Sequence, residues 1–292
     1  MKLKTIVLTM LFVLCLVFST ACQSSMVSDS SSIYKSPNVE VCLANDADAI
    51  KYTHYEWATI TDDIAYTKNT VIIAGVATNV RQATVNYEYM DTNVSDSITI
   101  FDVEVSDVLS CRSGSFQAGD LVTIGVGYNM DKYGEGLPIV TEGSSYLIFC
   151  YVAADQENDV LELAEYVDCW ISAPKDLFLE RVGDFYLSID YFSDIPESHH
   201  LVDCLNLTEK QIASLSTIAV DDTDAVDAYI DEKIMIGSEE TDMTEFADAL
   251  FVLKTRTMEK STELWNLANR SYLISCDELE EYVRDTALAY GD

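Results

Sequence analysis

Residues 70–78 read Thr70-Val71-Ile72-Ile73-Ala74-Gly75-Val76-Ala77-Thr78. β-Branched side chains favour extended backbone, and a short, continuous apolar run is typical of a buried strand. Residues 97–109 predict a second strand, in which the apolar positions slip by one residue between Ile100 and Phe101. A slip of this kind in a period-two pattern indicates a β-bulge. The first half of the chain therefore predicts a β-rich fold built around these two strands.

Three further strands follow turn signals such as Gly119-Asp120 and Gly143. We expect them at residues 121–126, 145–152 and 160–171, with a short helix at residues 62–68 before the first strand. Beyond residue 205 the sequence contains signals that start helices. Two capping boxes occur there, Thr208-Glu209-Lys210-Gln211 and Ser275-Cys276-Asp277-Glu278. Asp222 or Thr223 can cap a further helix between them. Residues 176–205 match neither pattern and receive no assignment.

The amino-terminal segment has the order of a secretory signal. Lys2 and Lys4 precede apolar residues 6–18, which are too few to span a bilayer that needs about 20 helical residues. Residues 18–22, Phe18-Ser19-Thr20-Ala21-Cys22, resemble the lipobox of bacterial lipoproteins, in which cleavage leaves a diacylglyceryl group on the cysteine. The resemblance implies a signal peptide at residues 1–21, lipidation of Cys22, and a location on the extracytoplasmic side of a bacterial cell membrane. Because Ser19 stands where the lipobox usually has an aliphatic residue, ordinary signal cleavage is the alternative.

Composition separates a tether from a folded body. Residues 23–38 contain seven serines in sixteen positions, and we expect residues 22–38 to be a flexible tether. The chain has 50 acidic and 17 basic residues and a formal charge of −33, yet 49% of it is hydrophobic, which is too apolar for a disordered acidic tail. So strong a negative charge excludes nucleic acid as a partner, because that binding needs Lys and Arg to replace counterions.

Six cysteines lie downstream of Cys22, namely Cys42, Cys111, Cys150, Cys169, Cys204 and Cys276. An even number of cysteines in an exported chain favours disulfides, and six cysteines allow fifteen connectivities. Spacing disfavours zinc, since no two of the six are close enough in sequence to form a Cys-x-x-Cys knuckle.

The order of the expected elements over residues 39–175 resembles the oligonucleotide/oligosaccharide-binding (OB) type of barrel shared by netrin modules and tissue inhibitors of metalloproteinases. The closest local likeness is Cys169-Trp170-Ile171-Ser172-Ala173-Pro174, because those inhibitors also have a cysteine shortly before a proline. The resemblance implies an α+β protein with a five-stranded OB-like antiparallel β-barrel at residues 39–175, a connection at 176–205 and a mainly helical region at 206–292.

The same resemblance implies a Cys42–Cys169 disulfide. For the other four cysteines we predict the pairs Cys111–Cys150 and Cys204–Cys276, which the resemblance does not fix. The inhibitory mechanism of those proteins does not carry over. They bind the catalytic zinc of their target through a free amino-terminal cysteine, whereas Cys42 is internal and has no free amino group.

The sequence contains no Gly-x-Ser-x-Gly, phosphate-loop or His-Glu-x-x-His motif, and we expect no catalytic residue, metal or cofactor. Barrels of the OB class bind ligands through their loops and one sheet face. The long connections at residues 81–96 and 127–143 contain the candidate binding residues Tyr87, Tyr89, Tyr128, Asn129, Asp131 and Tyr133.

The predicted function is therefore a binding or interaction module, held at the membrane by its amino-terminal lipid and facing an extracellular protein or glycan. Two alternatives stay open. One is a carboxylate-dependent hydrolase of envelope or extracellular polymer, and the other is an inhibitor of exported proteases that works through its loops.

Overall fold

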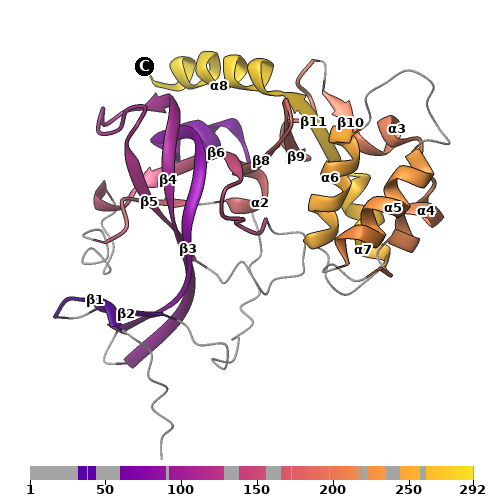
Figure 1. Ribbon diagram of the computed structural model, residues 1–292. Helices are drawn as coiled ribbons and strands as arrows, with labels where there is room; N and C mark the ends of the chain where they lie inside the picture. Colours follow the sequence, from indigo (N-terminus) through magenta and orange to yellow (C-terminus); the bar gives the residue numbers. More distant parts are fainter. Residues whose placement is uncertain are drawn as a thin grey trace, which may run out of the picture.

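The computed structural model describes residues 32–37, 39–43, 60–89, 92–127, 138–155, 166–171, 173–196, 198–215, 217–218, 222–234, 244–256 and 261–291. Within these ranges the strands belong to one eleven-stranded mixed sheet, and most helices gather at one side of it (Figure 1). The strands are β1 (Ser32–Lys35), β2 (Val39–Leu43), β3 (Val71–Tyr89), β4 (Thr92–Cys111), β5 (Leu121–Val126), β6 (Ser145–Val152), β7 (Cys169–Ile171), β8 (Phe178–Val182), β9 (Phe185–Ile189), β10 (His199–His200) and β11 (Ser271–Ser275). The helices are η1 (Asp63–Lys68), η2 (Ala153–Asp155), α2 (Pro174–Leu177), α3 (Leu201–Leu205), α4 (Glu209–Leu215), α5 (Thr223–Ile234), α6 (Thr244–Thr255), α7 (Ser261–Ala268) and α8 (Cys276–Gly291).

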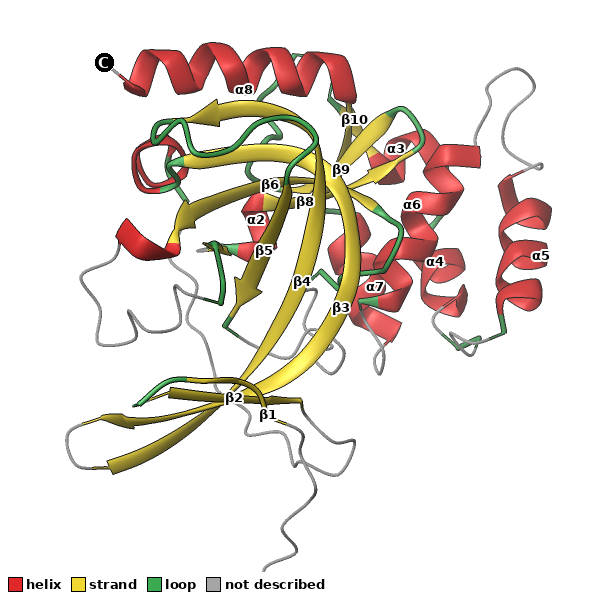
Figure 2. Cartoon of the chain, turned by 60° about the vertical axis from the view of Figure 1, so that its left-hand side comes forward, coloured by secondary structure: helices red, strands yellow, loops and turns green. Residues whose placement is uncertain are grey.

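β3 and β4 form a long, curved hairpin that runs through the sheet (Figure 2). Its register shifts where Asn79 and Val80 of β3 together face Phe101 of β4. Asn79 has a φ of 51°, in the left-handed region that Asn tolerates better than most residues. The β-bulge predicted beside Phe101 is therefore confirmed, with its extra residue on the partner strand.

The prediction of a five-stranded OB-like barrel is wrong. The sheet has the order β1-β2-β3-β4-β5-β7-β6-β8-β9-β11-β10, so the predicted strands are only its middle part. β3 pairs with β6 over residues 71–76 and with β2 over residues 83–87, which extends the sheet toward β1. β6 also pairs with β8, which extends the sheet toward β10. The observed architecture is one large mixed sheet with flanking helices.

The added strands come from segments that gave no strand signal. β8 and β9 form a hairpin within residues 176–205, which had no assignment. β11 lies between helices α7 and α8 in the region predicted to be mainly helical, and it pairs with β9 along all five of its residues. These strands are short, and the partner of β11 is distant in sequence, so hydrophobic periodicity alone could not identify the pairing.

Local signals elsewhere are confirmed. β5 and β6 have the predicted bounds, and α8 begins at Cys276 within the second capping box. In the first box the Thr208 backbone N–H donates to Gln211 Oε1 at 2.9 Å, and the Gln211 N–H donates to Thr208 Oγ1 at 3.4 Å. Asp222 Oδ1 accepts from the Ala225 N–H at 3.2 Å, as expected of a helix cap.

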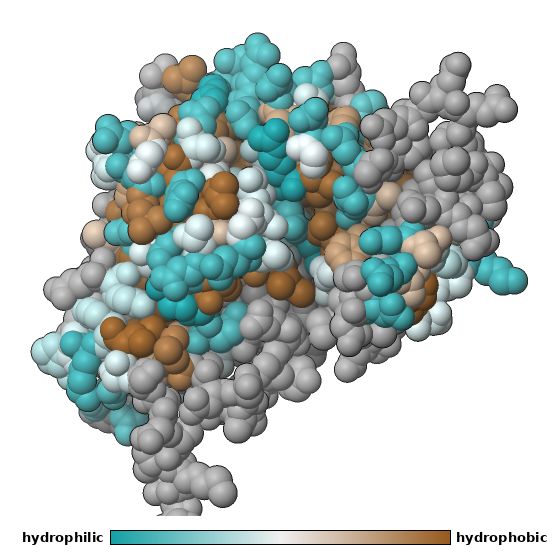
Figure 3. Space-filling view, viewed as in Figure 1, coloured by the Kyte–Doolittle hydropathy of each residue, from teal (hydrophilic) through white to brown (hydrophobic). Residues whose placement is uncertain are grey.

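The described residues bury four hydrophobic clusters. One joins β9 and β11 to helices α3–α7, a second lies inside the curve of β3–β7, and a third lies between the sheet and α8. The fourth, which includes Val41 and Val85, lies at the far end of the long hairpin. Figure 3 shows hydrophilic and neutral residues over most of the viewed face, with hydrophobic residues in small, separate groups.

Candidate functional site: the polar face of a sheet arm

Four strands at one end of the long hairpin form an arm that extends away from the helices (Figure 2). We define the arm as β1, β2, residues 83–89 of β3 and residues 92–98 of β4. All its pairings are antiparallel, and β1 is one of the two edge strands of the described sheet. β1 lies within residues 22–38, so the structure places the later part of the predicted tether in a strand.

The inner face of the arm is apolar. Val41 and Val85 are almost fully buried there, and Val167 packs against them from the segment before β7. Tyr34 of β1 stacks on Tyr166 with 5.3 Å between the ring centroids. This packing fixes which side of the arm faces the protein, because successive side chains of a strand point to opposite faces.

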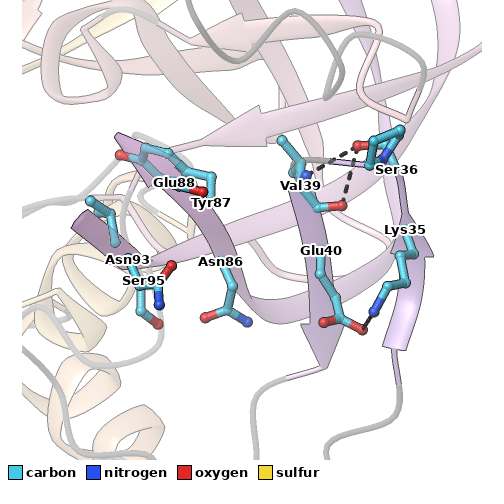
Figure 4. Close-up of a pocket in the computed structure, with 11 residues that line it drawn as sticks. Lys35, Ser36, Val39, Glu40, Asn86, Tyr87, Glu88, Asn93 and Ser95 are labelled. Atoms are coloured by element: carbon cyan, nitrogen blue, oxygen red, sulfur yellow. Dashed lines mark hydrogen bonds and ion pairs between the residues drawn. The ribbon is translucent and has the colours of Figure 1, made fainter. Parts of the chain in front are cut away.

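The outer face of the arm is polar. Glu40 of β2 is opposite Lys35 of β1 and also opposite Asn86 of β3, and Asn86 is opposite Ser95 of β4. These four residues therefore form one row across all four strands. Figure 4 shows the side chains of Lys35, Glu40 and Asn86 extending to the same side of the sheet.

This row lines a groove of about 450 Å³. A second row, in which Glu88 is opposite Asn93, continues the lining toward the end of the hairpin. The turn between β1 and β2 supplies Ser36 and Pro37. The volume falls within the range of roughly 300–1,000 Å³ that small-molecule sites occupy.

Short contacts fix the geometry at the β1 end of the groove. Lys35 Nζ lies 3.2 Å from Glu40 Oε1, and hydrogen bonds from Lys35 and Ser32 hold the pKa of Glu40 below its ordinary value. Glu40 therefore stays ionised at neutral pH and can accept hydrogen bonds. The Val39 N–H donates to Ser36 Oγ at 3.2 Å, and the Ser36 N–H donates to the Val39 carbonyl at 2.8 Å. These two bonds hold the turn.

Tyr87 is the predicted binding residue that the structure places at this groove. Its ring packs against the inner hydrophobic cluster, and its hydroxyl donates to Asp96 Oδ2 at 2.7 Å. Tyr89 ends β3, and its side chain is not described. Four candidates, Tyr128, Asn129, Asp131 and Tyr133, lie outside the described residues, as does Cys22.

The prediction of a long loop at residues 81–96 is wrong. These residues are the paired ends of β3 and β4, joined at residues 90–91. The predicted binding residues therefore did not include Lys35, Glu40, Asn86 and Asn93 of the groove. The alternation of Ala83, Val85 and Tyr87 with polar residues was the available signal, because it is the pattern of a strand with one wet face.

The six cysteines downstream of Cys22 are free thiols in the structure: Cys42, Cys111, Cys150, Cys169, Cys204 and Cys276. The three predicted disulfide pairings therefore stay predictions.

Buried carboxylates bear on the hydrolase alternative. Among the described residues, the buried carboxylates are Asp102 and Glu180. Asp102 accepts from Arg81 at 3.0 Å, and Glu180 accepts from Arg256 at 3.3 Å. Each buried carboxylate is thus paired with its own arginine.

No family model, curated protein or solved structure matches the chain. Over the described ranges, no group of three or more His, Cys, Asp or Glu side chains is arranged to hold a metal ion. The same part of the chain contains no helix that is both long enough and apolar enough to cross a membrane.

Proposed function

We propose that the chain is a membrane-anchored, extracytoplasmic binding module whose outer arm face holds a neutral glycan. The observation that carries this proposal is the row of Lys35, Glu40, Asn86 and Ser95 across four paired strands. The lipobox-like Cys22 supports the anchor and the location. A ligand site on paired strands is also better fixed than one on a mobile loop.

The chemistry of the groove favours a ligand rich in hydroxyl groups. The amides of Asn86 and Asn93 each offer donors and an acceptor, and the carboxylates of Glu40 and Glu88 are acceptors. One such amide or carboxylate can form hydrogen bonds to two neighbouring hydroxyl groups of a sugar at the same time. Pro37 in the turn between β1 and β2 is exposed at the groove and supplies an apolar contact for the C–H face of a sugar ring.

Charge favours a neutral sugar over an acidic one. The lining contains one lysine and two glutamates, and the whole chain has a formal charge of −33. A uronic acid or phosphorylated polymer would therefore be repelled both at the groove and at a distance. The arginines in the buried ion pairs do not face this groove, so they offer no compensating cation.

Binding of the full chain to a panel of neutral and acidic oligosaccharides tests the proposal. We expect a neutral oligosaccharide to bind, Asn86→Ala to weaken its affinity at least tenfold, and acidic members of the panel to fail. Asn266→Ala is the matched control, because Asn266 is an exposed asparagine on α7 in the helical part. Binding only of acidic sugars, of no sugar, or of a sugar whose affinity Asn86→Ala leaves unchanged would contradict the proposal.

A further inference from the structure

Cys150 and Cys169 lie on the neighbouring strands β6 and β7 and face the same hydrophobic cluster. Cys150 is opposite Ile171, and Cys169 is opposite Val152, so the two cysteines are diagonal neighbours across one antiparallel pair. Both are 0% exposed. A hydrogen bond with Cys169, together with burial, raises the pKa of the Cys150 thiol well above its ordinary value. The fold thus brings these two thiols into contact.

Cys111 approaches the same cluster from the other side, but strand β3 separates it from Cys150. Cys111 and Cys150 are both opposite Val71, one on each side of β3. Two strand spacings amount to about 9.5 Å, whereas a disulfide needs Cα atoms within about 7 Å. Diagonal neighbours of one antiparallel pair lie about 7–8 Å apart at their Cα atoms, which is at the edge of this limit and closer than Cys111. The register therefore favours Cys169 over Cys111 as the partner of Cys150.

The remaining cysteines lie elsewhere in the fold. Cys42 is on the outer face of the arm, where Asn86 Nδ2 lies 4.0 Å from its sulfur. Cys204 packs against the cluster of the helical part, and Cys276 belongs to the cluster beneath α8. None of these three thiols faces the cluster that contains Cys150 and Cys169.

We infer that Cys150 and Cys169 are the pair that forms a disulfide in this protein, and that this bond fixes the segment on which the arm rests. In the reaction a thiolate of one cysteine attacks the disulfide of an oxidised thiol carrier and releases one carrier thiol. The second cysteine then attacks the mixed disulfide and releases the other. Two thiols of the chain lose two electrons and two protons, and the carrier disulfide becomes two thiols.

The segment around Cys169 connects the disulfide to the arm. Tyr166, Val167 and Trp170 pack against the inner cluster of the arm, while Cys169 points to the cluster inside the curve of β3–β7. β7 itself has only three residues and pairs with β5 at two of them. A covalent bond from Cys169 to β6 would therefore hold a short strand in place directly beneath the arm. The inference does not depend on what the groove binds.

Disulfide mapping of the full chain tests the inference. The protein is reduced, refolded with oxidised and reduced glutathione, alkylated and digested without reduction. We expect mass spectrometry to find a Cys150–Cys169 cross-linked peptide, with Cys111 alkylated as a free thiol. A Cys42–Cys169 or Cys111–Cys150 peptide, or alkylation of both Cys150 and Cys169, would overturn the inference.

Hydrogen exchange on the same oxidised and reduced samples tests the consequence for the arm. Reduction should speed exchange of the β2 and β7 amides at least fivefold while leaving α4 unchanged. Reduction should also lower the melting temperature by about 5 °C, from the usual effect of a loop of this size. The matched variant is Cys204→Ser, which should keep both responses, whereas Cys169→Ser should abolish them. Equal exchange in β2 and β7 before and after reduction would refute the role of the bond in fixing the arm.

Discussion

Gly125→Ala should destabilise the protein through Trp170, which lies beneath the arm. Gly125 is buried in β5 and pairs with Trp170 of β7. A Cβ atom at this position would lie 2.7, 2.8 and 2.9 Å from three carbons of the Trp170 ring. Carbon atoms pack best at about 3.5–4.0 Å, so the ring must move by roughly 0.6–1.3 Å.

The expected cost is about 1–3 kcal/mol, the usual effect of one extra methyl group in a packed site. Gly127→Ala is the control, because nothing lies within 4 Å of a Cβ there. Both variants gain the same benefit from a stiffer unfolded chain, so their difference isolates the contact with Trp170.

Urea unfolding followed by circular dichroism measures this difference. Replacing the ring in the double variant Gly125→Ala/Trp170→Leu should reduce the cost of the added methyl by about 1 kcal/mol, since the two side chains contact each other. The reasoning is refuted if Gly125→Ala and Gly127→Ala unfold within about 0.5 kcal/mol of each other.

Three further predictions concern other parts of the chain. Thr208→Ala should cost about 1 kcal/mol in urea unfolding because it removes the α4 capping box, and Thr208→Ser should restore most of it; an equal loss in both variants would count against the cap. Burial raises the pKa of Glu180 above the ordinary value of a glutamate, so the folded state holds this proton to higher pH than the unfolded state does. The unfolding free energy of the wild type minus that of Glu180→Gln should therefore fall as pH rises above about 4.5. A difference that stays flat or rises between about pH 4 and 7 would contradict this prediction. Cys22→Ala should move the protein from the membrane fraction to the soluble fraction, and unchanged detergent partitioning would refute lipidation.

Signals that act within a few residues predicted local structure well. The Thr208 capping box and the slip beside Phe101 each depend on neighbouring backbone groups, and both are present in the structure. β5 and β6 were predicted to the residue because turn residues bound them closely. Such features need no knowledge of distant partners.

Pairing between distant segments could not be predicted in the same way. β11 is a five-residue strand between two helices, and it is defined by pairing with β9. A period-two pattern identifies a strand but not which neighbours it has, so five strands in a row were taken to close into a barrel. β3 does pair with β6, but the pairings of β3 with β2 and of β6 with β8 continue the sheet beyond these five strands to eleven.

At the candidate site, too, the local features could be predicted from the sequence and the pairing of distant segments could not. The polar residues on β3 and β4 alternate with buried ones, so their exposure could be predicted once residues 81–96 were recognised as strands. The presence of Lys35 and Glu40 on the same face could not be predicted, because it depends on the pairing of β1 with β2 and of β2 with the hairpin. The polar face of the arm exists only where four strands from two distant segments meet.

The most direct test of the central claim is the location of the bound ligand. Hydrogen exchange of the full chain, with and without the best-binding neutral oligosaccharide, compares the arm with the helical part. We predict slower exchange on binding at residues 35–40, 86–88 and 93–95, with no change in α4 or α7. Protection confined to the helices, or absent from β2 and from residues 86–88 and 93–95, would contradict the claim that the polar face of the arm is the binding site.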